Sequence, residues 1–95
     1  MVWILNRLNS IRGIMVHHIT IDFGKYELSV ITGKGAYGGS EGMYEIAIFE
    51  DGDFVRLPGF GFLDDDVIGY LSSQRVNGMI KKMFAITGND PVLVK

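Results

Sequence analysis

Hydrophobic and polar residues alternate along residues 16–30, and a short turn signal interrupts the alternation. From Ile19 to Phe23 every second residue is apolar, which is typical of a strand with one buried face. Gly24-Lys25 follows, and glycine suits the first central position of a type II′ turn because it tolerates positive φ. The pattern therefore predicts a hairpin with three apolar pairs on one face: Phe23 with Tyr26, Ile21 with Leu28, and Ile19 with Val30.

A second alternating stretch, residues 44–57, carries its own turn. Asp51-Gly52 is the residue pair expected in a type I′ hairpin turn. The resulting register brings Phe49 and Phe54 together on one face. On the other face it predicts two pairs: Ile48 with Val55, and Ile46 with Leu57. Pro58 has no N–H to donate to a neighbouring strand, so we expect the strand to end there.

The last third of the chain changes period. Residues 67–71 form a short apolar run that we interpret as a fifth strand. Ser72 or Ser73 is a suitable N-cap for a helix. The positions that follow at helical spacing are Val76, Met79, Ile80, Met83, Phe84 and Thr87. Gly88 and Pro91 mark the end of this helix, and residues 92–94 are expected to add a short terminal strand.

These elements predict an α+β fold: an antiparallel sheet of four to five strands built from two β-hairpins, with one C-terminal α-helix packed on one face. The chain has 95 residues and a hydrophobic content of 47%, which suffice for one domain, placed here over residues 15–95. Gly78 weakens the helix relative to alanine, so we expect it to allow close contact with the sheet. The expected core wall consists of alternate strand residues: Ile19, Ile21, Leu28, Val30, Ile46, Ile48, Val55 and Leu57.

Residues 1–14 form an N-terminal extension whose role the sequence leaves open. A secretory signal is not expected, because Asn6-Arg7 interrupts the apolar run. Three interpretations remain: a disordered extension, an interfacial amphipathic anchor with a thin polar face, or a start-site artefact in which Met15 is the true first residue. The residues at helical spacing are Ile4, Leu8, Ile11 and Met15, with Arg7 and Arg12 beside them.

The composition excludes several kinds of chemistry. The chain has no cysteine, so disulfides, thiolate catalysis and cysteine-ligated metal sites are impossible. No apolar run approaches the length of about 18 residues that a membrane span requires, so no span is expected. We expect a cytoplasmic protein.

The net charge is only −2, but acidic residues concentrate in the middle of the chain. Between Glu41 and Asp66 there are eight acidic residues and one base, Arg56. An acidic middle is a poor footprint for nucleic acid, which requires a clustered basic face, whereas it attracts a basic protein. The acidic candidates for an interaction surface are Glu41, Glu50, Asp51, Asp53, Asp64, Asp65 and Asp66.

Residues 33–42 join the two predicted hairpins through a glycine-rich loop. Its first six residues match the G-x-G-x-x-G pattern of dinucleotide-binding and protein-kinase loops. The dinucleotide fingerprint needs a helix after the third glycine, whereas a strand is expected here. The kinase pattern needs a lysine on the following strand, at the position that Phe49 occupies. We therefore interpret the segment as an inter-hairpin loop with Lys34 and Tyr37 as candidate recognition residues.

No catalytic, cofactor or metal site is expected. Adjacent residues on a strand point to opposite faces, so His17 and His18 cannot share a metal ion. The consecutive carboxylates of Asp64, Asp65 and Asp66 diverge on an extended chain and lack the spacing of a calcium loop.

Two functional hypotheses from different classes remain. The favoured one is a small non-enzymatic protein-interaction module, for example a phage or mobile-element protein that modulates a basic host factor through its acidic surface. The alternative is a small-molecule or nucleotide-binding domain, such as an enzyme subunit, that uses Lys34 and the amides of residues 33–42. Phe49 and Phe54, on the face opposite the expected core, also leave a homodimer open.

Overall fold

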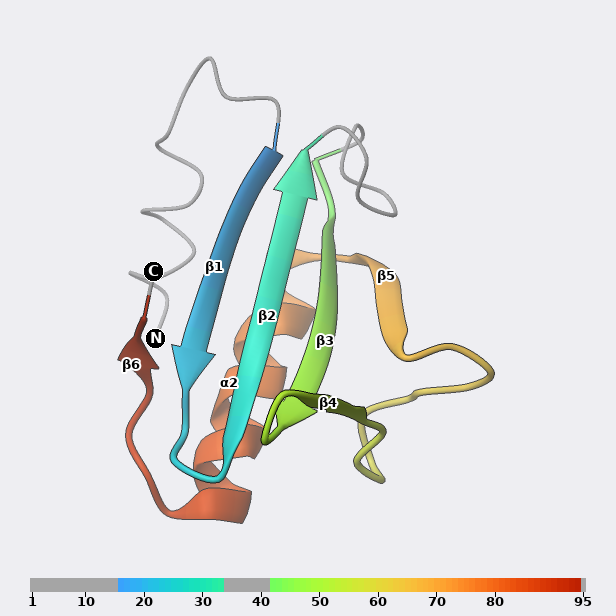
Figure 1. The fold of residues 1–95 in the computed structure, drawn as a ribbon. Coiled ribbons are helices and arrows are strands. Elements are labelled where there is room, and N and C mark those ends of the chain that lie inside the picture. Colours follow the sequence, from blue (N-terminus) through green and yellow to red (C-terminus); the bar gives the residue numbers. More distant parts are fainter. Residues whose placement is uncertain (1–15, 34–41, 95) are drawn as a thin grey trace.

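The computed structural model describes residues 16–33 and 42–94, and within them it shows an α+β fold (Figure 1). An antiparallel six-stranded sheet carries one described helix on one face. The predicted fold class is confirmed, and a short C-terminal strand adds to the sheet. The elements are β1 (Val16–Asp22), β2 (Tyr26–Gly33), β3 (Tyr44–Glu50), β4 (Asp53–Val55), β5 (Val67–Leu71), α2 (Ser73–Thr87) and β6 (Val92–Leu93).

The first hairpin forms in the predicted register. Gly24 has a φ of 89°, as its place in the turn requires. The backbone N–H of Phe23 donates to the carbonyl of Tyr26 at 2.8 Å and closes the loop. The observed pairs include Ile21 with Leu28 and Ile19 with Val30.

The second hairpin is confirmed near its turn and wrong further along. Asp51 and Gly52 both have positive φ, 52° and 83°, as a type I′ turn requires. The predicted pairs of Ile48 with Val55 and of Phe49 with Phe54 are present. Ile46, however, does not pair with Leu57, because β4 ends at Val55 and the chain leaves the sheet. Ile46 pairs instead with Ile68 of β5.

The order of strands reflects the fact that β3 pairs with both β4 and β5. The sheet runs β4-β3-β2-β1-β6, and β5 also pairs with β3. Strand β4 lies beside residues 48–50 of β3, whereas β5 lies beside residues 44–47. The two short strands therefore share one edge of β3, and β2 and β3 are both flanked on two sides.

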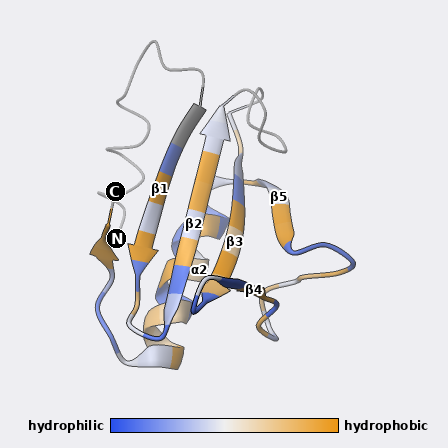
Figure 2. Ribbon diagram, viewed as in Figure 1, coloured by the Kyte–Doolittle hydropathy of each residue, from blue (hydrophilic) through white to orange (hydrophobic). Residues whose placement is uncertain are grey.

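The core lies between the sheet and α2, where alternate strand residues meet the apolar side of the helix. Figure 2 shows apolar positions recurring along β1, β2 and β3. Val55 and Leu57 are only partly buried, and Phe84, predicted on the buried side of the helix, is 42% exposed. The buried residues of the sheet and helix include Ile19, Ile21, Leu28, Val30, Ile46, Ile48, Val76, Met79, Ile80 and Met83.

Helix α2 begins and ends as predicted. The Ser72 hydroxyl accepts a hydrogen bond from the backbone N–H of Arg75 at 3.2 Å, which caps the N-terminus. Gly88 has a φ of 71°, and its N–H donates to the carbonyl of Phe84 at 2.7 Å. The expectation for Gly78 is wrong: this residue is exposed, and a Cβ there would meet no atom within 4 Å. In residues 16–33 and 42–94, no helix has the length and apolar character to cross a membrane.

Candidate functional site

The sheet face opposite α2 is not covered by any described element (Figure 1). Because side chains alternate along a strand, the residues between the core positions of β1, β2 and β3 all point to this face. They surround a depression of about 360 Å³ that we call the sheet groove. Its lining residues are His18, Thr20, Glu27, Ser29, Ile31, Glu45, Ala47, Phe49, Gly52, Phe54 and Val67.

The floor of the sheet groove is a row of cross-strand neighbours. Each member lies directly opposite the next on the neighbouring strand, so the row crosses four strands. Its members are Thr20, Ser29, Ala47 and Val67. Ser29 and Ala47 at its centre are both 6% exposed, although no described element lies above them. These two small side chains lie below the level of the larger side chains on either side.

Larger side chains form the two walls of the groove. Phe49 and Phe54 stand on one side with ring centroids 4.6 Å apart and planes tilted by 37°. Phe54 is 50% exposed, although it belongs to this aromatic pair. On the other side Ile31 stands between His18 and Glu45 on the neighbouring strands. The result is a trough between an aromatic pair and a mixed wall in which Ile31 is the apolar member.

The charges around the sheet groove are acidic. Among the described residues of the lining, Glu27 and Glu45 carry carboxylates, and none is a lysine or arginine. His18 Nε2 lies 2.8 Å from the Ser29 hydroxyl, so this imidazole is held by the floor. Asp51 and Asp53 flank Gly52, and both are exposed. The acidic β3–β4 turn is thus continuous with one end of the groove.

The acidic residues predicted as an interaction surface fall into two groups. Glu50, Asp51 and Asp53 lie at the β3–β4 turn, and the second group lies in the loop before β5. Two members have cationic partners: Glu50 lies 3.5 Å from Lys25 Nζ, and Asp66 accepts from Arg56. Of the described residues in this predicted set, four are exposed and form no ion pair with a described residue: Asp51, Asp53, Asp64 and Asp65. The other three predicted residues, Lys34, Tyr37 and Glu41, lie outside the described part of the chain.

The Glu50 carboxylate raises the pKa of Lys25 above its ordinary value, and Tyr26 contributes in the same direction. Lys25 Nζ lies 5.5 Å from the centre of the Tyr26 ring. The pair closes the loop end of the first hairpin against the end of β3. Neither Lys25 nor Tyr26 is among the described lining residues of the sheet groove.

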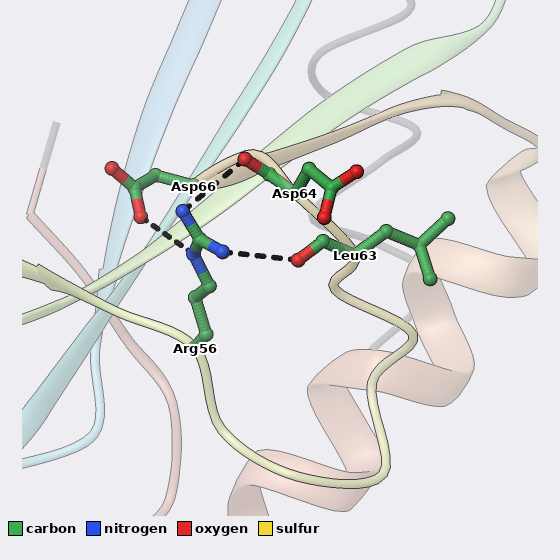
Figure 3. A network of polar contacts seen from close by, with 4 residues as sticks. All are labelled: Arg56, Leu63, Asp64 and Asp66. Carbon is green, nitrogen blue, oxygen red and sulfur yellow. Dashed lines mark hydrogen bonds and ion pairs between the residues drawn. The ribbon is translucent and has the colours of Figure 1, made fainter.

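Arg56 holds the loop that leads into β5 (Figure 3). Its Nε donates to the Asp66 carboxylate at 2.9 Å, and its two terminal nitrogens donate to the carbonyls of Leu63 and Asp64 at 3.0 and 3.3 Å. Leu63, whose carbonyl accepts one of these hydrogen bonds, is 83% exposed. Arg56 therefore has a structural role that the sequence did not indicate.

Strand β5 contains a bulge that the sequence analysis missed. Ile68 pairs with Ile46 and Leu71 with Tyr44, so Gly69 and Tyr70 together stand opposite one residue of β3. Tyr70 adopts a φ of 57°, in the left-handed region, and is 61% exposed. No short sequence motif predicts a bulge at this position.

The remaining chemistry of the described residues is limited. They contain no group of three or more His, Cys, Asp or Glu residues that could hold a metal ion. The glycine-rich segment lies between Gly33, the last residue of β2, and Tyr44, the first residue of β3. These two strands are adjacent and antiparallel. Residues 34–41 lie outside the described part of the chain, so the interpretation of this segment as an inter-hairpin loop stays a prediction.

The sequence analysis predicted only part of the lining of the sheet groove. Alternation placed Phe49 and Phe54 on the correct face, but Ser29 and Ala47 were not singled out. The available signal was that β3 is apolar on both faces, as Ala47 and Phe49 show. Comparisons with protein-family models, with curated proteins and with solved structures found no match to this chain.

Proposed function

We propose that this protein is a non-enzymatic interaction module that binds a partner protein through the sheet groove. The observation that carries the proposal is the lining of the groove, where Ala47, Phe49 and Phe54 provide apolar surface and the charged groups are carboxylates. An aromatic pair with one half-exposed ring, Phe54, beside a recessed floor of small side chains is typical of an interface anchor. The proposed partner has apolar side chains for the trough and basic side chains for its margins.

The acidic turn supports the same partner. Asp51 and Asp53 lie next to Gly52 at one end of the groove and extend its negative field. Clustered charge of one sign accelerates encounter with a partner of the opposite sign and rejects partners of the same sign. A cytoplasmic modulator of a basic host factor, encoded by a phage or another mobile element, is one protein that would use such a surface.

The same charges weigh against two copies that meet groove to groove. Such a dimer would bring Glu27 and Asp53 of one copy close to the acidic groups of the other. Like charges in a contact of this kind cost binding free energy. We therefore propose a different, basic protein as the partner rather than a homodimer.

Site-specific photo-crosslinking tests the proposal. A benzophenone amino acid replaces Phe54 in one variant and Phe84 in another, because both rings are exposed but Phe84 lies on α2. After irradiation in the natural host cell, we expect one discrete adduct at position 54 and none at position 84. An adduct at position 84 alone, or equal adducts at both positions, would contradict the proposal.

Charge variants give this experiment a matched control. Glu27 and Asp90 are both exposed acidic residues, but only Glu27 lines the groove. Glu27→Lys should abolish the adduct at position 54, whereas Asp90→Lys, with the same change in net charge, should preserve it. Equal loss in both variants would show that the contact responds to net charge and not to the groove.

A further inference from the structure

The groove lies on strands whose hydrogen-bonding edges are already occupied. Strand β2 pairs with β1 and β3, and β3 pairs with β2 on one side and with β4 and β5 on the other. A partner segment seated over Ser29 and Ala47 therefore finds no free backbone edge to extend. Its own N–H and C=O groups must be satisfied within the segment, because an unpaired buried backbone group is costly. Of the regular structures, a helix meets this condition by itself.

The dimensions of the groove agree with a helix. The floor row crosses four strands, from Thr20 on β1 to Val67 on β5. Three inter-strand spacings amount to about 14 Å. A helix of roughly ten residues has this length, and it presents apolar side chains along one side at positions three and four apart.

The charges define the flanks of that helix. Glu27 stands in the same wall as Phe49 and Phe54, and Asp51 and Asp53 lie at the end of that wall. Lysine or arginine side chains beside an apolar stripe would reach these carboxylates while the stripe fills the trough. An acidic helix of the same shape would be repelled.

We infer that the occupant of the sheet groove is an amphipathic helix of a partner protein, with an apolar stripe flanked by lysine and arginine residues. The inference rests on the proposed function and adds the conformation and the chemistry of the segment that is bound. Phe54 anchors the stripe, and Glu27 pairs with a flanking base. The complex then has the sheet between two helices, α2 on one face and the partner's helix on the other.

Two designed peptides with one composition test this inference on the full chain. Both contain leucine and lysine over roughly 14 residues, but one repeats leucine at helical spacing and the other alternates leucine with lysine, as a strand does. A third peptide has the helical pattern with glutamate in place of lysine. Binding of each dye-labelled peptide is measured by fluorescence anisotropy. We expect the helical leucine–lysine peptide to bind at least about tenfold more tightly than either of the others.

Variants then locate the bound peptide. Phe54→Ala should weaken binding of the helical peptide by about tenfold, and Glu27→Lys should weaken it by a similar factor. Phe84→Ala and Asp90→Lys are the matched controls, and each should change the affinity by less than about twofold. Equal effects of the groove variants and the control variants would overturn the inference.

Other occupants give different results, and each of them overturns the inference. Tighter binding of the alternating peptide would mean an extended segment. Self-association of the wild-type chain in sedimentation, lost in Phe54→Ala, would mean a second copy. If the helical peptide bound only to the double variant Leu8→Asp/Ile11→Asp, the chain's own N-terminal residues would be the occupant of the groove. The crosslink at position 54 separates the two proposals: if it forms while the helical peptide fails, the inference falls and the interaction module stands.

Discussion

The side-chain amide of Asn89 donates a hydrogen bond to the backbone carbonyl of Phe23, 2.8 Å away and 66 positions earlier in the sequence. The bond ties the segment after α2 to the end of β1, where the Phe23 side chain is fully buried. Gly24 makes this approach possible, because a Cβ there would lie 2.6 Å from the Asn89 amide nitrogen. One polar contact thus connects the first hairpin to the C-terminal end of the helix.

We predict that Asn89→Ala lowers the free energy of unfolding by about 1 kcal/mol, because a part-buried carbonyl loses its donor. Asn77→Ala is the matched control. The Asn77 side-chain oxygen is buried and has no hydrogen-bond partner among the described residues, so its removal should be neutral or stabilising. Urea denaturation measures both variants. Similar losses in the two variants would contradict the assignment of the Asn89 bond.

Two glycine-to-alanine substitutions should act in opposite directions. Gly78→Ala is expected to stabilise the protein by about 1 kcal/mol, because the site is an exposed helix interior with free space for a Cβ. Gly24→Ala should destabilise it by at least about 1 kcal/mol, since φ is 89° and the new methyl group would collide with Asn89. Thermal unfolding of both variants gives the comparison. A loss of stability in Gly78→Ala would contradict the position given to this residue.

The left-handed conformation of Tyr70 leads to a third prediction. Asparagine tolerates positive φ and valine does not, so Tyr70→Asn should keep or raise the free energy of unfolding. Tyr70→Val should lower it by about 1–2 kcal/mol. Chemical denaturation orders the three proteins. If the Tyr70→Val variant proved more stable than the Tyr70→Asn variant, the assignment of a bulge opposite β3 would be contradicted.

The Lys25–Glu50 pair predicts a dependence on pH. The pKa of Lys25 in the folded protein is raised above its ordinary value of 10.5, chiefly by the Glu50 carboxylate. The pair therefore stabilises the fold fully below pH 10.5, and this contribution is lost as the pH rises through the folded-state pKa.

A lysine-to-methionine comparison checks this sign. Lys25→Met should have a lower urea midpoint than the wild type at about pH 8, and the difference should shrink toward about pH 12. Added salt should reduce the difference as well, because Lys25 is exposed. Lys81→Met is the control, since Lys81 forms no ion pair with a described residue. A difference that grows with pH would contradict the prediction.

The two hairpins could be predicted because each register is fixed locally. Gly24 and the Asp51-Gly52 pair accept the backbone conformations of tight turns, and alternation on either side then leaves one register that buries the apolar face. Helix α2 was predictable for the same reason, since Ser72 and Gly88 cap it by local chemistry.

The missing parts depend on pairings that no local signal specifies. Strands β2 and β3 align across residues 34–41 without a two-residue turn to fix the register, and only that register puts Ser29 opposite Ala47. Strand β5 replaces the expected end of β4 beside Ile46, and its bulge at Tyr70 follows from that distant contact. The groove floor results from these long-range pairings, so only the aromatic pair beside it could be predicted from the sequence.

Chemical-shift mapping of the ¹⁵N-labelled full chain, titrated with the partner protein captured at position 54, tests the central claim most directly. The sheet groove predicts the largest shifts at the backbone amides of Ser29, Ala47 and Phe54, with little change at Lys81 and Ile86 on α2. Large shifts along α2, with the amides of Ser29 and Ala47 unmoved, would contradict the account.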